Sequence, residues 1–320
     1  MKNLNFKTLA LFGFLATVGI SCTNDDNSSG PNATLTETIQ SRAEISTFAS
    51  ALDIAGLSDM LDGSDQYTVF APTNAAFDNW MLQNGYSTLS SIPVATLKEL
   101  LYNHMMQGSS ETGEILNGYR KSLAHGGASS TNYMSMYFTH DPGIKVNGDA
   151  MVVTPDIEAQ NGFLHVVDHV IGLPTLKTMI QADPDLSSMA GALAFDPSSG
   201  FMDTLNDTIA QPMTLFIPSN SGFSSFLTEL GYGNVGEVPA ANLLSIMNYH
   251  MWANQNALSS SFTNGQSIMM NNGQNVTVNL TGGGKKLTDA SGRVSTITTS
   301  DIQTSNGMIH IIDNGLLPTL

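Results

Sequence analysis

Cysteine, basic side chains and long apolar runs are all scarce in this sequence. Cys22 is the single cysteine among 320 residues, so the chain cannot form an internal disulfide. Lysine and arginine together number 11 against 27 aspartates and glutamates, which gives a formal net charge of −16. Such a balance disfavours nucleic acid and anionic lipid surfaces as partners. No apolar run is long enough to span a bilayer as a helix.

Catalytic and cofactor motifs are absent as well. The sequence has no Gly-x-Ser-x-Gly elbow and no His-Glu-x-x-His zinc helix. The glycine-rich stretch 282–286 lacks the upstream glycine and the following hydroxyl residue of a phosphate loop, so we expect a hairpin loop there. Met134 and Met136 offer two thioethers, but methionine commonly fills cores. An enzyme using loop carboxylates such as Asp141 or Asp156 is the alternative, yet no spacing supports it. We expect no enzyme activity, cofactor or metal.

The first 21 residues have the layout of a secretory signal. Lys2 and Lys7 precede the apolar run Leu9–Ile20. A small residue, Ser21, then stands directly before Cys22. This arrangement resembles the lipobox of bacterial lipoproteins, in which the cysteine is acylated and becomes the new N-terminus. We expect lipidation of Cys22, and the alternative is an ordinary signal with an incidental cysteine.

A short polar segment follows the signal. Residues 22–33 contain no large apolar side chain and are expected to form a flexible tether. The pair Asp25 and Asp26 resembles the export signal of surface lipoproteins in the Bacteroidetes, with an ordinary solvated linker as the alternative. These features predict an outer-membrane lipoprotein of the cell envelope, exposed at the surface and attached to the membrane only through Cys22.

The remainder of the chain is a tandem repeat. Thr68–Phe77 reads Thr-Val-Phe-Ala-Pro-Thr-Asn-Ala-Ala-Phe, and a close copy returns 146 residues later as Thr214–Phe223. Asn161–Asp168 reads Asn-Gly-Phe-Leu-His-Val-Val-Asp and returns 145 residues later as Asn306–Asp313. Blocks that recur at nearly one offset indicate a duplicated domain.

These blocks, with a tyrosine and a histidine between them, resemble the signature segments of fasciclin (FAS1) domains. The resemblance extends over nearly the whole chain after residue 34 and predicts two domains, 34–175 and 176–320. It implies an α+β fold in which each domain is a compact β-sandwich or wedge with several packed helices. The mixed helix and strand periodicities agree with that fold class.

Local patterns predict the elements around the first signature. Thr68–Pro72 is expected to be a buried strand that ends at Pro72, because proline lacks a backbone donor. Thr73 or Asn74 then caps the next helix. A further helix is predicted over 94–107 and its counterpart over 240–252. Antiparallel strands are predicted between 119 and 153 and between 268 and 297. An irregular insertion is expected at 190–200 of the second copy.

The Tyr-His region supplies the candidate binding residues. In the fasciclin family this region is associated with adhesion to cell-surface receptors, so the resemblance points to Tyr102, His104, Tyr249 and His250. Only the second copy keeps tyrosine and histidine adjacent, which favours the second domain. The alternative is structural: both side chains cover the edge of the core, with their polar atoms bonded locally.

A recurring His-x-x-Asp pattern invites a metal or acid/base interpretation. His165 and Asp168 recur as His310 and Asp313. Residues three apart on a strand point to opposite faces, so the two side chains of one motif cannot readily share a ligand. We expect each of them to be satisfied by nearby backbone or hydroxyl groups.

The sequence therefore predicts a non-catalytic, lipid-anchored protein that binds an extracellular partner through two domains, with avidity compensating for weak single contacts. The partner is a protein or a polysaccharide, the second as an accessory of a polysaccharide-capture system. Exposed aromatic faces would favour sugar. Trp80 and Trp252 are the only tryptophans, and both fall at helical core spacing, which favours a protein.

Overall fold

The computed structural model describes residues 32–140 and 142–320, and every structural statement below concerns these residues. The predicted signal, the predicted lipidation site Cys22, most of the predicted tether and Asp141 lie outside the described residues. The described part of the chain forms one compact unit by its internal contacts. None of its helices combines the length and the apolar character that a membrane crossing requires.

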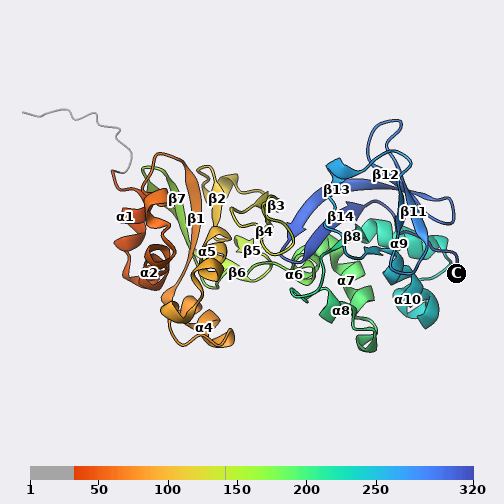
Figure 1. Cartoon of the computed structure of the whole chain (residues 1–320), viewed down its shortest axis with the longest axis horizontal. Coiled ribbons are helices and arrows are strands. Elements are labelled where there is room, and N and C mark those ends of the chain that lie inside the picture. Colours follow the sequence, from red (N-terminus) through yellow and green to blue (C-terminus); the bar gives the residue numbers. More distant parts are fainter. Residues whose placement is uncertain (1–31, 141) are drawn as a thin grey trace, which may run out of the picture. The chain divides into compact units, whose positions relative to one another are not determined.

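Each copy of the repeat has its own helices and strands (Figure 1). The first copy contains α1 (Leu35–Gln40), α2 (Ser46–Ala55), α3 (Ser58–Leu61), α4 (Asn74–Gln83) and α5 (Val94–Tyr102), with strands β1 (Tyr67–Pro72), β2 (Met105–Gln107), β3 (Gly118–Lys121), β4 (Ser135–Thr139), β5 (Lys145–Val146), β6 (Ala150–Ala159) and β7 (Gly162–Val167). The second contains α6 (Leu176–Ala182), α7 (Ser187–Ala194), α8 (Phe201–Thr204), α9 (Asn220–Glu229) and α10 (Ala240–Tyr249), with strands β8 (Met213–Pro218), β9 (Met251–Trp252), β10 (Ser267–Met269), β11 (Asn275–Asn279), β12 (Lys286–Thr288), β13 (Val294–Thr304) and β14 (Gly307–Ile312). Short 3-10 turns lie at Ala43–Ile45, Leu89–Ser91, Thr112–Glu114, Pro184–Leu186, Pro197–Ser199, Val235–Glu237 and Ser259–Ser261.

The two sheets have the same strand order. The first runs β2-β1-β7-β6-β5-β4-β3, and the second, read from the corresponding edge, runs β9-β8-β14-β13-β12-β11-β10. The two signature strands of each domain are parallel neighbours, with Val69 opposite Leu164 and Leu215 opposite Ile309. The other strand pairs are antiparallel, including the predicted hairpin around the glycine-rich loop. The predicted α+β architecture of two tandem domains is confirmed.

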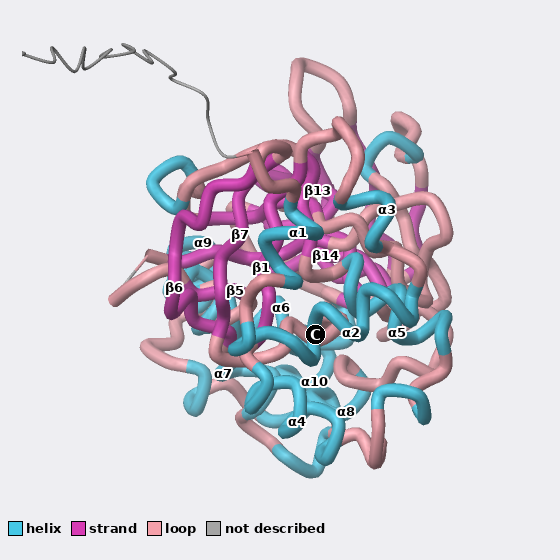
Figure 2. Tube along the Cα trace, turned by 90° about the vertical axis from the view of Figure 1, so that its left-hand side faces the viewer, coloured by secondary structure: helices cyan, strands magenta, loops and turns pink. Residues whose placement is uncertain are grey.

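The first signature strand is buried on both faces because its side chains alternate between two cores. Val69 and Ala71 belong to a cluster formed with the helices, whereas Phe70 belongs to a second cluster formed with the strands β4 to β6. In the second domain, Leu215 and Phe216 divide in the same way. Figure 2 shows α2 and α5 side by side in the helical layer of the first domain.

The junction after the signature strand forms as predicted. Pro72 ends β1, and the side chain of Thr73 then caps α4 by accepting the backbone N–H of Ala76 at 3.2 Å. Asn74 has another task, since its amide oxygen accepts the N–H of Thr47 at the start of α2. Ser219 caps α9 in the second copy, so the exchange of threonine for serine leaves this junction intact.

The Asn-Gly pair before the second signature strand ties the sheet to the first helices. Asn161 accepts the N–H of Leu35 at 2.8 Å and donates to the carbonyl oxygens of Leu61 and Gly63. Gly162 has a φ of 145°, and a Cβ atom there would lie 1.8 Å from the carbonyl oxygen of Tyr67. Only glycine fits such an approach between two strands.

Three sequence predictions about element boundaries are wrong. The helix predicted over 94–107 ends at Tyr102, and the helix predicted over 240–252 ends at Tyr249, because a short edge strand begins two or three residues later in each copy. Trp252 therefore lies in a strand. The insertion predicted at 190–200 is irregular only after Ala194, since α7 continues to that residue.

The two domains share contacts within the compact unit. Tyr137 of β4 packs in the apolar cluster of the second domain, beside α6. The hydroxyl of Tyr119 donates to a carboxylate oxygen of Asp183 at 2.8 Å, and the N–H of Gln303 donates to the hydroxyl oxygen of Ser135 at 3.1 Å. Strand β4 therefore contributes side-chain contacts to both domains.

Candidate binding regions

His250 is enclosed at the end of α10. Its Nε2 atom accepts the backbone N–H of Leu316 at 2.9 Å, so the ring proton lies on Nδ1, which donates to the carbonyl oxygen of Ile246 at 2.8 Å. The residue is 1% exposed. Burial lowers the pKa of the imidazole to about 4, because the charged form would lose its hydration. The neutral ring thus joins the last turn of α10 to the segment after β14.

His104 has the same arrangement in the first domain. Its Nε2 atom accepts the N–H of Ile171, and its Nδ1 atom donates to the carbonyl oxygen of Leu100. Burial again lowers the pKa to about 4. The two histidines are therefore equivalent clamps between a helix end and the segment that follows the second signature strand.

Tyr249 is fully buried and ties α10 to the sheet of the second domain. Its hydroxyl donates to the carbonyl oxygen of Asn275 at 2.6 Å and accepts the N–H of Ala290 at 2.9 Å. Burial raises the pKa of this phenol to about 12. The side chain holds β11 and the turn between β12 and β13 against the helix.

Tyr102 is not the structural counterpart of Tyr249. Because His104 and His250 are equivalent, the residue of the first domain that corresponds to Tyr249 is Asn103. The buried Asn103 donates to the carbonyl oxygens of Ile171 and Gly172. Tyr102 precedes it and is partly exposed, with the ammonium group of Lys98 5.8 Å from its ring centroid. Among the four residues predicted to bind a partner, only Tyr102 reaches the surface, and the binding role of all four stays a prediction.

The histidine of each second signature is bonded to a backbone bulge. The N–H of Asp156 donates to Nδ1 of His165 at 3.0 Å, so Nε2 carries the proton and donates to the carbonyl oxygen of Ser110. Asp156 has a φ of 56° beside a register shift in β6, and its carboxylate accepts both the N–H and the hydroxyl of Thr112. Burial lowers the pKa of His165.

The second domain repeats this bulge. Asp301, with a φ of 64°, donates its N–H to His310, and its carboxylate accepts the N–H and hydroxyl of Ser259. The sequence interpretation missed Asp156 and Asp301 as a repeated pair. Their common position, nine residues before the signature histidine in both copies, was the signal that would have identified them.

The aspartates of the His-x-x-Asp motifs are bonded elsewhere, as predicted. Asp168 accepts the N–H of Met151 at 2.7 Å, and Asp313 accepts the N–H of Thr296 at 2.7 Å. Histidine and aspartate of one motif are therefore satisfied separately. Within the two described ranges, no cluster of three or more histidine, cysteine, aspartate or glutamate residues could hold a metal ion.

Both tryptophans are half-buried. Trp80 stacks on Tyr86 with the ring centroids 5.8 Å apart and packs against the core of the first domain. Tyr133, by contrast, is 45% exposed. It borders a depression of about 260 Å³ whose polar lining includes Gln107 and Arg120. An aromatic face beside amide and guanidinium donors has the composition of a carbohydrate contact.

Comparison with known sequences and structures agrees with this geometry. A family model described as the fasciclin domain matches residues 43–174 and again residues 184–318. The chain resembles a solved FAS1 domain pair from the insect cell adhesion molecule Fasciclin I, with a TM-score of 0.50 and 20% sequence identity. That likeness covers 86% of this chain and 97% of the other, and it shows the fold.

Two curated relatives extend the comparison. The chain is 26% identical over 269 residues to periostin of Homo sapiens, and this alignment covers 83% of this chain and 30% of periostin. It is also 26% identical over 184 residues to Fasciclin-1 of Drosophila melanogaster, and this alignment covers 54% of this chain and 26% of that protein. The chain thus spans less than a third of the length of either relative.

Proposed function

This chain belongs to the fasciclin domain family, and we propose on that basis that its tandem domains bind an extracellular protein. The family consists of non-catalytic, adhesion-type domains. The observation that carries the proposal is the match of both halves of the chain to the family model. Both copies also retain the histidine clamp and the bulge, so neither is a degenerate repeat. Two intact domains allow two weak contacts to act together.

We further propose that Cys22 carries a lipid that holds the protein in the outer membrane with its domains facing outward. The support is the sequence alone: an apolar segment ending in Ser21, a single cysteine, and the acidic pair that follows it. Acyl chains on one cysteine would leave both domains free in the surrounding medium, where an extracellular partner is available.

We assign an indirect binding role to Tyr249 and His250. Both side chains are buried, so a partner cannot touch them while the domain is folded. Their hydrogen bonds fix the backbone of the exposed residues Asn275 and Ala290 and of the buried Leu316. Loss of either side chain would therefore displace these backbone segments and weaken the binding of a partner to them.

A glycan partner is the second candidate, and the depression at Tyr133 favours it. The chain would then be an accessory of a polysaccharide-capture system. Aromatic side chains stack on the apolar faces of sugar rings, while neighbouring amide and guanidinium groups bond the hydroxyls. Tyr133 and Arg120 meet both requirements.

An array that displays both extracellular matrix proteins and polysaccharides tests the two candidates with residues 31–320, which form the compact unit. Saturable binding to proteins that is unchanged in Tyr133→Ala and reduced in Tyr249→Phe supports the proposal. Saturable binding to one glycan class that is lost in Tyr133→Ala replaces it with the glycan function. Absence of saturable binding to both classes contradicts both candidates.

A further inference from the structure

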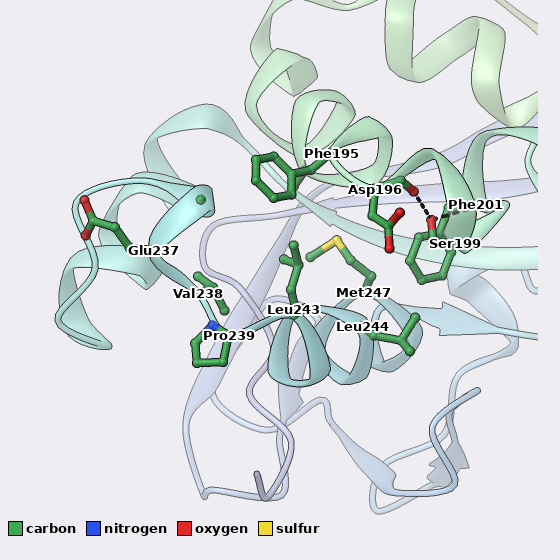
Figure 3. Close-up of a pocket in the computed structure, with 13 residues that line it drawn as sticks. Phe195, Asp196, Ser199, Phe201, Glu237, Val238, Pro239, Leu243, Leu244 and Met247 are labelled. Atoms are coloured by element: carbon green, nitrogen blue, oxygen red, sulfur yellow. Dashed lines mark hydrogen bonds between the residues drawn. The ribbon is translucent and has the colours of Figure 1, made fainter.

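The second domain contains a cavity at a place where the helix packing of the two domains differs. It lies between α10 and the segment that runs from α7 to α8, and its volume is about 550 Å³ (Figure 3). In the first domain, the corresponding helices α2 and α5 pack directly against one another. No contact of similar extent joins α7 to α10 in the described residues.

A local insertion accounts for the difference. Thr47 and Ser188 are equivalent, because each donates to the asparagine after its signature strand, and Leu61 and Leu205 are equivalent through the Asn-Gly contacts. Between these points the second copy is three residues longer. Helix α7 ends early, since Pro197 cannot continue it, and the extra residues form the wall of the cavity.

The lining is mainly apolar and in part open to solvent. Leu243 and Met247 of α10 are buried in the cavity floor, whereas Phe195 is 53% exposed and Leu244 is 47% exposed at the rim. Figure 3 shows Leu243 and Met247 pointing from α10 toward the segment that carries Phe195, whereas Leu244 projects to one side. Exposed apolar surface in a concave site is the usual feature of a ligand pocket.

The charged side chains that line the cavity are both acidic. Asp196 and Glu237 both line it, on opposite sides in Figure 3, and no basic residue does. One oxygen of Asp196 accepts the N–H and hydroxyl of Ser198, and Glu237 accepts the N–H of Gly233. These bonds hold both carboxylates in place and leave acceptor capacity for a ligand.

We propose that this cavity binds small amphiphiles that have an apolar body and a cationic amine head. The body fills the space between Phe195, Leu243 and Met247, which removes their apolar surface from water. The amine remains at the rim, where it pairs with Asp196 or Glu237. An anionic amphiphile of the same length is disfavoured, because its head would face two carboxylates without a basic partner.

Methyl NMR on methionine-labelled residues 31–320 tests this site, with decylamine, decanol and decanoate added below their micelle concentrations. The Met247 signal is expected to shift saturably, at the lowest concentration with decylamine and at the highest with decanoate. Met105 is a buried methionine of the first domain and should not move. Equal affinity for decylamine and decanoate, or no saturable shift with any of the three, overturns the proposal.

Two variants separate the apolar and charged parts of the site. Ala240→Trp, at the exposed first residue of α10, places a ring in the cavity and should abolish the shift with all three compounds. Asp196→Asn keeps a cap acceptor and should weaken decylamine about fivefold while leaving decanol unchanged. Asp59→Asn makes the same charge change on α3 of the first domain and is the control. Unchanged decylamine binding in Ala240→Trp contradicts the proposed site.

Discussion

The Nε2 atom of His250 accepts the backbone N–H of Leu316 at 2.9 Å, which links the end of α10 to a residue 66 positions further along the chain. His104 makes the same bond to Ile171, 67 positions further along. Each imidazole also bonds a carbonyl oxygen of the preceding helical turn. One side chain per domain thus satisfies two buried backbone groups from distant segments.

Replacement of this side chain should be costly. His250→Ala leaves the N–H of Leu316 and one carbonyl oxygen without a partner in the core, and we expect a loss of about 3 kcal/mol in the free energy of unfolding. Urea denaturation followed by circular dichroism measures it. His169→Ala, at an exposed histidine, is the control. A loss equal to that of the control would show that water replaces the imidazole in the clamp.

The same histidines should make stability depend on pH. Their pKa is about 4 in the folded chain and about 6.5 when unfolded, so the unfolded chain binds more protons between these values. Stability is fully present above pH 6.5 and decreases as the pH falls toward 4, by up to about 3 kcal/mol per histidine. Urea midpoints should therefore fall as the pH is lowered from 7.5 to 5. This window isolates the histidines, because most carboxylates titrate at lower pH.

A variant separates the histidine contribution from that of the carboxylates. His250→Gln removes one titrating group, so its unfolding free energy should depend less on pH than that of the unmodified chain over the same window. Parallel pH curves for the two proteins would contradict the assignment, because the slope would then come from other groups.

Tyr249 should contribute through its hydroxyl as well as its ring. Tyr249→Phe keeps the ring but removes the bonds to Asn275 and Ala290, and we expect a loss of about 2 kcal/mol. Hydrogen exchange at the Ala290 amide should accelerate by the corresponding factor. The matched control is Tyr102→Phe, at a partly exposed tyrosine, which should change neither quantity. Unaltered exchange at Ala290 in Tyr249→Phe would contradict the role of this phenol as a tether.

The repeat allowed most of the fold to be predicted, while single positions were missed for physical reasons. The signature strand, its proline end and its capped helix follow from local patterns, and they form as expected. The predicted helices extended beyond their true ends at Tyr102 and Tyr249, because the apolar spacing of each helix continues into a short strand. Periodicity cannot separate the two cases over three residues.

The candidate site was harder to predict because burial of polar groups leaves no periodic signal. A tyrosine next to a histidine is equally consistent with a surface contact and with a hydrogen-bonded core pair. Which of the two forms depends on hydrogen-bond partners that lie far away in the sequence. The partners of Tyr249 lie 26 and 41 residues away. The bulge at Asp156 depends on a positive φ, which a single aspartate in a strand pattern does not announce.

Glycine at the start of β7 should be irreplaceable. Gly162→Ala would place a Cβ atom 1.8 Å from the carbonyl oxygen of Tyr67, so β1 and β7 would have to separate, and we expect more than about 4 kcal/mol of destabilisation. Gly172→Ala meets nothing within 4 Å and is the control. The measurement is thermal unfolding of both variants. A folded Gly162→Ala variant with an unchanged midpoint would show that this strand pair tolerates separation.

Two opposing contributions to stability meet at the Asp301 bulge, a strained backbone and a bonded carboxylate, and substitutions can separate them. Its φ of 64° strains any residue except glycine and, to a lesser degree, asparagine or aspartate, whereas its carboxylate binds the N–H and hydroxyl of Ser259. Burial alone would raise the pKa of this carboxyl, but the bonds from Ser259 hold it below its usual value. Asp301→Ala loses the carboxylate and keeps the strain, so it should destabilise the second domain most. Asp301→Gly loses only the carboxylate and should be milder than alanine by about 1 kcal/mol, while Asp301→Asn should cost least. Urea denaturation of the three variants gives the order, and equal losses for alanine and glycine would mean that the backbone at this bulge carries no strain.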